Sequence, residues 1–502
     1  MESMAKTSRR LILAAAMAAA GTASAPVSAD METLLDKLHE KGVLSDEDYQ
    51  QMRTEARAER RAQALKDAND AEKSTKAKEE SATTMTGRFK DGVSWESGDK
   101  STAFSVNGRV QGDYRAFEGN TAANTFDVRR AYLGAKGRFY DDITFNVTGD
   151  FAQSSGNAGS NISTANNTTP ASTGTSSGSP VQLDEAYVNF GWIKSAQIRV
   201  GQFQMPFSLE KITSDLFNNF QERFIGDTMS PDKLRGLMVT GAPTTGLYYA
   251  LAVANGNGAK NTNDVNNQVD GKEGIGRLAV NFAEMFGQKK AVYHVGGSYA
   301  DTTMPVGSAF SGRTEARGIT FFTPIAFTGT PVDRKQTGIE TALAYGPVKF
   351  QGETVTSNYS GTNAGGVEYD KDIKTYYASV VWMITGESYA DAYANSVFTR
   401  MRPNANFTGH GGGWGAWELG LRVSKWDAND FKTGPAGTGT IAAAGTTAQA
   451  DALTVGLKWI PNPNTRVLLN YIRTKFDTPV NVAGNTPTDQ EKAITLRAQF
   501  DF

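Results

Sequence analysis

The chain has 502 residues with a formal net charge of −2, so its overall charge gives no argument for binding nucleic acid. It contains no cysteine, which excludes a disulfide framework and thiolate metal sites, and we expect no cofactor. No apolar run reaches the 18 residues that a spanning helix needs. The mean hydropathy of −0.41 does not exclude a membrane β-barrel, because barrel strands are only half apolar.

Residues 1–29 have the pattern of a secretory signal peptide. Lys6, Arg9 and Arg10 give a basic start, residues 11–20 are apolar, and the small residues at 27–29 fit cleavage after Ala29. A buried helix is the alternative for this stretch. We expect the mature protein to leave the cytoplasm.

Residues 30–85 are predicted to form a helical, partly disordered periplasmic segment. Gly42 fits the end of one helix, and Ser45 with Asp48 fits a capping box at the start of the next. After Met52 the segment is rich in Ala, Arg, Glu and Lys and lacks sustained heptads, so a strong coiled coil is not supported. A charged spacer and a self-associating helix both stay open.

From residue 86 to residue 502 the pattern changes to strands. A short hairpin is expected near 87–95, followed by about sixteen segments in which apolar and polar residues alternate. They lie near 103–117, 126–139, 142–151, 181–190, 196–203, 236–241, 247–254, 275–282, 291–299, 337–345, 347–355, 374–384, 415–426, 452–459, 465–475 and 492–502.

The connections between these segments alternate between short turns and long loops rich in Gly, Ser, Thr and Asn. This layout is typical of an outer-membrane barrel, and so is a last strand that ends on an aromatic residue, Phe502. Residues 385–414 are the exception, because a short turn is expected there. Either this segment is an excursion into the periplasm, or the strand count is wrong at this place. The sequence predicts an all-β fold, a 16-stranded antiparallel transmembrane β-barrel.

The stretch 126–151 shows the two faces of the wall. Leu133 and Val147 lie on its apolar faces, whereas Arg130 and Tyr132 lie on a polar face that needs water. In a barrel the apolar face contacts lipid and the polar face lines the lumen.

The third long connection, about 204–235, is more apolar than the other loops, with Leu216, Phe217, Phe220 and Phe224 at helical spacing. We expect it to fold into the barrel as a constriction loop. Packing over a rim or against a neighbouring subunit is the alternative.

Three stretches carry a resemblance to a known family: Phe126-Asp-Val-Arg-Arg-Ala-Tyr-Leu-Gly134, Leu183-Asp-Glu-Ala-Tyr-Val-Asn-Phe190 and residues 199–211. They resemble the phosphate- and polyphosphate-selective porins. The resemblance implies a homotrimer of 16-stranded barrels in the bacterial outer membrane, with membrane lipid around it and inorganic anions such as phosphate as its cargo. It also implies an anion-binding constriction made of Arg129, Arg130, Tyr132, Asp184, Lys211 and Arg223, and an arginine ladder for which Arg235, Arg277, Arg313 and Arg317 are candidates.

Guanidinium groups fit phosphate oxygens and stay charged at working pH. Neighbouring strand residues point to opposite faces, so both Arg129 and Arg130 reach the lumen only at a bulge or a strand end. Otherwise Arg129 serves the loop side, a subunit contact or the membrane edge.

The sequence therefore predicts a passive anion channel, with a general porin for small hydrophilic solutes as the alternative. We expect no enzyme and no nucleic-acid partner. The histidines, His39, His294 and His410, are scattered and form no convincing catalytic or metal motif, so a barrel-wall hydrolase or a structural tether ranks last.

Overall fold

The computed structural model describes residues 28–88, 92–152, 181–256, 271–304, 310–324, 331–362, 366–432, 445–482 and 487–502. Two compact units are present, residues up to Thr84 and residues from Met85 onward. The predicted signal peptide lies outside the described residues except for its last two, which begin a helix. The predicted loop residues 153–180, 257–270 and 433–444 also lie outside them.

The first unit consists of two helices, α2 (Ser28–Glu40) and α3 (Asp46–Thr83). Gly42 follows α2 with a φ of +66°, and the Ser45 hydroxyl accepts a hydrogen bond from Asp48 N at 3.2 Å, as a capping residue does. Tyr49 is buried and stacks on His39 with ring centroids 4.3 Å apart. Apart from this small contact α3 is polar on all sides, and no helix among the described residues is long and apolar enough to cross a membrane.

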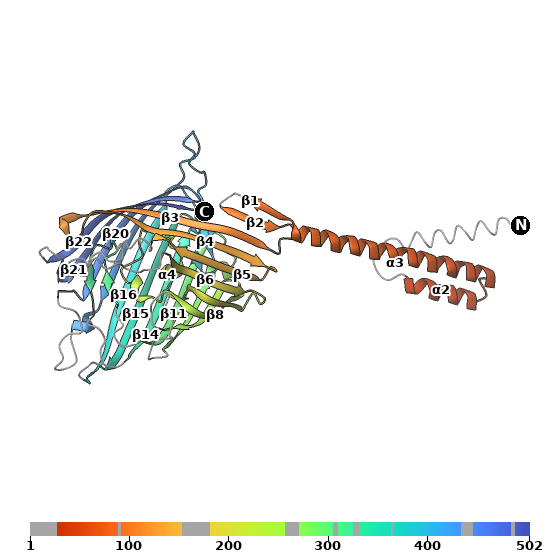
Figure 1. Cartoon of the computed structure of the whole chain (residues 1–502), viewed down its shortest axis with the longest axis horizontal. Helices are drawn as coiled ribbons and strands as arrows, with labels where there is room; N and C mark the ends of the chain where they lie inside the picture. Colours follow the sequence, from red (N-terminus) through yellow and green to blue (C-terminus); the bar gives the residue numbers. More distant parts are fainter. Residues whose placement is uncertain are drawn as a thin grey trace. The chain divides into compact units, whose positions relative to one another are not determined.

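The second unit begins with a hairpin of β1 (Met85–Arg88) and β2 (Val93–Ser97), close to the predicted one. Sixteen long strands follow within the described ranges (Figure 1). They are β3 (Ala103–Phe117), β4 (Thr125–Phe139), β5 (Ile143–Asp150), β6 (Gln182–Phe190), β7 (Gln197–Gln204), β8 (Lys233–Thr244), β9 (Leu247–Asn255), β10 (Lys272–Asn281), β11 (Ala291–Met304), β14 (Val332–Tyr345), β15 (Val348–Thr362), β16 (Glu368–Met383), β19 (Ala416–Asp427), β20 (Gln449–Asn462), β21 (Thr465–Val480) and β22 (Thr488–Asp501).

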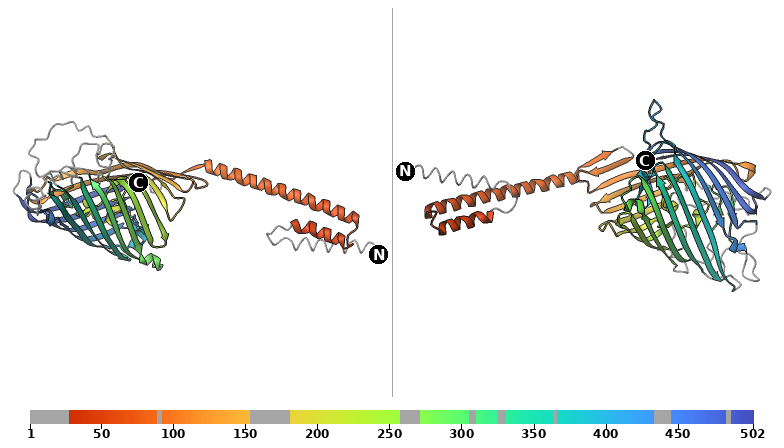
Figure 2. Two further views of the ribbon diagram at one scale, coloured as in Figure 1. Left: turned by 90° about the horizontal axis from the view of Figure 1, so that it is seen from below. Right: turned by 180° about the vertical axis from the view of Figure 1, so that it is seen from behind.

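These strands form a closed antiparallel barrel, which confirms the predicted fold class. Each strand pairs with the next in sequence, and β22 pairs with β3, for instance Arg497 opposite Asp113. Phe502 continues this pairing, because its N–H donates to Gly108 O and its carbonyl accepts from Gly108 N, both at 3.0 Å. Closure leaves no free edge in the wall, as a barrel in lipid requires. Figure 2 shows the strands tilted side by side from two further directions.

The strand alternation places apolar side chains outside and polar side chains inside. On β22, Ile494 and Leu496 are exposed on the outer face, whereas Thr495 and Arg497 are buried inside. Leu133 and Val147 are likewise about half exposed. The predicted strand ends differ from the observed ones by a few residues, because the longest strands extend beyond the apolar band.

The third loop, residues 205–232 between β7 and β8, lies inside the barrel and reaches the opposite wall. Asn219 donates to both carboxylate oxygens of Glu418 on β19 at 3.0 Å, and Gln499 on β22 donates to Leu216 O at 3.2 Å. Phe220 packs against the wall at Gly420 and Gly456, where a Cβ on either glycine would lie 3.0 Å from its ring.

The apolar residues of this loop do not form the helix that their spacing suggests. The only regular α-helix among the loop's residues is α4 (Leu209–Ile212), and η4 (Asp227–Met229) is a single 3-10 turn. Phe220 and Phe224 are buried against the wall instead. These apolar side chains are buried by contacts with the wall, so their burial does not require a helix in the loop.

Two further segments fold into the barrel, which the sequence did not predict. The first contains β12 (Gly312–Arg313), β13 (Thr320–Phe322) and Glu315, which accepts from Arg422 on β19 at 2.6 Å. The second occupies residues 384–415, contains η6 (Tyr389–Ala392), β17 (Tyr393–Ala394) and β18 (Val397–Phe398), and shares one apolar cluster with Leu209 and Phe220 of the third loop.

Residues 384–415 thus explain the exception in the predicted alternation of loop lengths. The strand count is right, and the segment at the short-turn end is long because it returns into the lumen. Arg277 on β10 donates to Ser396 Oγ at 2.8 Å, and His294 on β11 is hydrogen-bonded to the Tyr393 hydroxyl at 2.7 Å.

Candidate functional site

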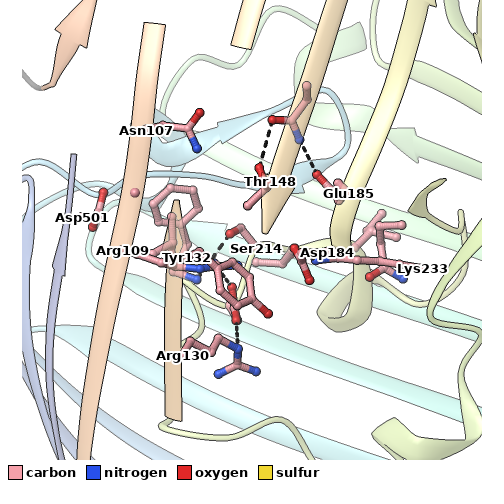
Figure 3. Close-up of a pocket in the computed structure, with 18 of the residues that line it drawn as sticks. Asn107, Arg109, Arg130, Tyr132, Thr148, Asp184, Glu185, Ser214, Lys233 and Asp501 are labelled. Carbon is pink, nitrogen blue, oxygen red and sulfur yellow. Dashed lines mark hydrogen bonds and ion pairs between the residues drawn. The ribbon is translucent and has the colours of Figure 1, made fainter. Parts of the chain in front are cut away.

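A cavity of about 440 Å³ lies between the third loop and the wall formed by β3 to β6 (Figure 3). On its other side the loop contacts β15, β19 and β22, through Glu353, Glu418 and Gln499. Side chains that can bind an anion or shape its path line this cavity: Asn107, Arg109, Arg130, Tyr132, Lys136, Asn146, Thr148, Asp184, Glu185, Lys211, Ser214, Asp215, Arg223, Asp232, Lys233 and Arg400.

A β-bulge on β4 decides where the two adjacent arginines point. Gln111 on β3 pairs with Arg130, but the next residue, Gly112, pairs with Val128, so Arg129 is the extra residue of the bulge. The bulge breaks the alternation, and both guanidinium groups reach carboxylates of the third loop inside the barrel. Both arginines therefore face the lumen, because a bulge is present where one was required.

Arg130 lines the cavity, and its side chain is 10% exposed. Its guanidinium group forms an ion pair with Asp215 of the third loop, and its Nη1 donates to Gln111 Oε1 at 2.8 Å. Arg109, on β3, forms a second ion pair with Asp215. The Arg109 guanidinium carbon lies 3.9 Å from the centre of the Tyr132 ring, a cation–π contact that orients this side chain.

Arg129 lies in a neighbouring cluster around Glu222 of the third loop. Its Nε donates to Glu222 Oε1 at 2.9 Å. Arg497 donates to the same oxygen at 2.7 Å and Arg115 at 3.2 Å, while Arg317 lies 4.0 Å from Oε2. One carboxylate thus holds four guanidinium groups together.

Electrostatics keeps both loop carboxylates ionised. Burial raises the pKa of the Asp215 carboxyl, but Arg109 and Arg130 outweigh burial and hold that pKa far below its usual range. Burial acts on Glu222 in the same way, and its arginine neighbours hold its pKa well below the usual value. The two acids therefore keep their charge throughout the physiological pH range.

The other predicted site residues lie around the same cavity. Asp184 on β6 forms an ion pair with Lys233 on β8. Lys211 Nζ lies 3.3 Å from Asp227 Oδ2, and Arg223 donates to Lys211 O at 3.2 Å, so both cations also brace the loop.

The structure therefore brings Arg130, Tyr132, Asp184, Lys211 and Arg223 to one cavity and places Arg129 beside it. Arg109, Lys136, Asp215, Lys233 and Arg400 also line this cavity, and none of them was among the predicted site residues. Arg109 is identifiable from the lumenal alternation of β3, whereas Asp215 carries no periodic signal because it lies in a turn.

The four candidate residues of the arginine ladder lie in different parts of the barrel. Arg313 and Arg317 come from the inward segment around β12, and Arg317 joins the Glu222 cluster. Arg277 instead pairs with Glu340 at 2.5 Å, and Arg235 donates to Gln202 at 3.1 Å. These contacts place Arg277 and Arg235 on other parts of the wall.

The arrangement is suited to holding an oxyanion by several guanidinium forks at once, with Tyr132 and Ser214 as hydroxyl donors. Among the described residues no group of three or more His, Asp and Glu side chains could hold a metal ion. The lining offers positive charge and hydrogen-bond donors around an open cavity.

Comparisons with known proteins give the family. Residues 104–502 match the family described as Phosphate-selective porin O and P. Porin O of Pseudomonas aeruginosa is 24% identical over 449 residues, which cover 83% of this chain and 92% of that protein.

Solved structures with a similar fold include an anion-selective porin from Comamonas acidovorans (TM-score 0.48, 13% identity, covering 80% of this chain and 100% of that chain). Another is the outer membrane channel DcaP of Acinetobacter baumannii (TM-score 0.46, 10% identity, covering 80% and 97%). Members of the matching family are porins, which are channels rather than enzymes. The chain belongs to the phosphate-selective porin O and P family and is a porin of the bacterial outer membrane.

Proposed function

We propose that this porin passes phosphate or polyphosphate by diffusion and that Arg130, with Tyr132 and Arg109, forms the selective contact. The observation that carries the proposal is the meeting of two wall arginines at one lumenal cavity, where the third loop leaves open space. A passing anion exchanges its hydration shell for guanidinium and hydroxyl donors.

Arg129, Lys211, Asp184 and Arg223 have supporting roles in the proposal. Arg129 and Lys211 add positive potential beside the path, and Arg223 fixes the loop backbone through Glu210 O and Thr213 O, both at 3.0 Å. Asp184 orients Lys233 through their ion pair. The cavity lining carries more cations than carboxylates, so selectivity for anions comes from the local cluster and not from net charge.

Planar-bilayer recordings test the proposal. In a salt gradient the wild type is expected to give a reversal potential that favours anions, and Arg130→Ala is expected to reduce that preference about tenfold or more, as the loss of a charged hydrogen-bonding partner does. Arg473→Ala is the matched control, because Arg473 lies on the outer face of β21 and donates to Gln490. Unselective or cation-selective current from the wild type contradicts the proposal.

A general porin for small hydrophilic solutes is the second candidate function. The third loop and residues 384–415 narrow the lumen without any need for anion binding, which is the observation that favours it. Millimolar phosphate that leaves the chloride current unchanged would support this function over the first.

We propose further that residues 1–29 are removed as a signal peptide, that the helical segment 30–85 lies in the periplasm, and that three barrels associate. Mass spectrometry of the mature N-terminus and chemical cross-linking in outer-membrane fractions test the first and third of these. Protease access in intact and permeabilised cells tests the second.

A further inference from the structure

Each arginine of the adjacent pair is matched with its own carboxylate from the third loop. Arg130 pairs with Asp215, and Arg129 pairs with Glu222. The positive charge of the proposed anion site is therefore already partly balanced by carboxylates of the third loop.

Asp215 differs from Glu222 in its surroundings. Glu222 is held by four guanidinium groups and does not line the cavity, whereas Asp215 lines it and pairs with two guanidinium groups. Asp215 belongs to a short turn, in which Phe217 N donates to Ser214 O at 2.8 Å. Its carboxylate meets the same two guanidinium groups, Arg109 and Arg130, that a passing oxyanion would use.

We propose that Asp215 is an internal competitor for the permeating anion. This inference rests on the proposed function and goes beyond it, because it assigns the release of the anion to one loop residue. A carboxylate and one edge of a phosphate present similar oxygen pairs to a guanidinium fork. An anion that occupies the arginines displaces Asp215, and Asp215 takes them back when the anion leaves.

The competition has a clear consequence for transport. A channel conducts well only when its ligand binds strongly enough to enter and weakly enough to leave. Two arginines without a counter-charge would hold a multivalent anion too long. A tethered carboxylate lowers the apparent affinity and shortens each stay, so it favours flux over retention.

Two substitutions at Asp215 separate the effect of its charge from that of its shape. Asp215→Asn preserves the shape of the side chain and removes its charge, so Arg109 and Arg130 lose their shared partner. Asp215→Glu preserves the charge one methylene further out. Asp142→Asn is a matched control for charge, because Asp142 lies in a short turn and pairs with Lys194 at 2.7 Å, away from the cavity.

The experiment is inhibition of the chloride current by inorganic phosphate in planar bilayers for the wild type and these three variants. Asp215→Asn is expected to lower the half-inhibiting phosphate concentration about tenfold or more, since it removes one charge next to two opposite charges in a poorly hydrated site. Blocked intervals are expected to lengthen by a similar factor. Asp142→Asn is expected to behave like the wild type, and Asp215→Glu, which keeps the charge, is expected to fall between the wild type and Asp215→Asn.

The outcomes separate this inference from the proposed function. If phosphate blocks the wild type but Asp215→Asn shows equal or weaker block, the competitor is wrong and the proposed function stands. If phosphate does not block the wild type and its current is unselective, the proposed function fails and the competitor fails with it.

A second measurement distinguishes the loss of the competitor from a displacement of the third loop. The competitor predicts a higher preference for anions over cations in Asp215→Asn, measured from the reversal potential. A larger conductance with unchanged selectivity overturns the inference. Heat-modified gel migration confirms that each variant has a folded barrel.

Discussion

Replacing Glu222 with glutamine is expected to lower the free energy of unfolding of the barrel by about 3–5 kcal/mol, the range for removing one partner of a buried ion pair. The Glu222 side chain is 12% exposed, and those of Arg115 and Arg497 are 2% exposed. The amide still accepts a hydrogen bond, but the four guanidinium groups then keep only Asp113, which pairs with Arg115 and Arg497, as a counter-charge. The mutual repulsion of these arginines then increases in a poorly hydrated place.

The assay is unfolding of the detergent-solubilised barrel in urea, followed by tryptophan fluorescence and gel migration. Glu118→Gln is the matched control, because Glu118 is 67% exposed and pairs with Lys492 at 3.2 Å, a surface contact of about 0–1 kcal/mol. Phosphate is expected to restore part of the stability of Glu222→Gln by binding the arginines that lose this partner. Equal unfolding midpoints for Glu222→Gln and Glu118→Gln would refute the reasoning, because Asp113 alone would then suffice as the counter-charge of the arginine cluster.

Two other predictions concern pH and the segment 384–415. The folded pKa of Asp215 lies far below the value of about 4 for an unfolded carboxyl, so its ion pairs stabilise the fold fully above pH 4 and this contribution is lost only as pH falls below it. Urea midpoints from pH 2 to pH 8 check this, and a step between pH 5 and pH 8 that Asp215→Asn abolishes would contradict it. Arg277→Met removes the ion pair with Glu340 and the hydrogen bond to Ser396, and it is expected to speed protease cleavage within residues 384–415. Unchanged cleavage in limited proteolysis would show that this segment is held by its apolar contacts alone.

The strands of the barrel wall could be predicted from the local sequence pattern. A strand in a barrel wall faces lipid on one side and water on the other. Apolar and polar residues therefore alternate along the strand with a period of two. The alternation in Ile494, Thr495 and Leu496 is enough to assign β22, and the same argument assigns its partners. Strand ends were less certain, because the alternation continues beyond the apolar band into polar residues.

The lumen was less predictable than the wall. Residues 384–415 look like an oversized turn in the sequence, and nothing in their pattern says that they return into the barrel. Phe398 and Met401 find their partners in the third loop, more than 170 residues earlier, and contacts of that separation leave no local period. The inward segment around Phe321 was missed for the same reason.

The sequence by itself determined the strand count, the direction of each face and the family resemblance, because these follow from local alternation and from short motifs. Only the tertiary structure decided that Arg129 and Arg130 both face inward, since one bulged residue on β4 breaks the alternation. It also decided that the proposed site contains Asp215. That carboxylate meets Arg109 and Arg130 only because the third loop crosses the lumen, and a contact made by crossing the barrel depends on the closed wall as a whole.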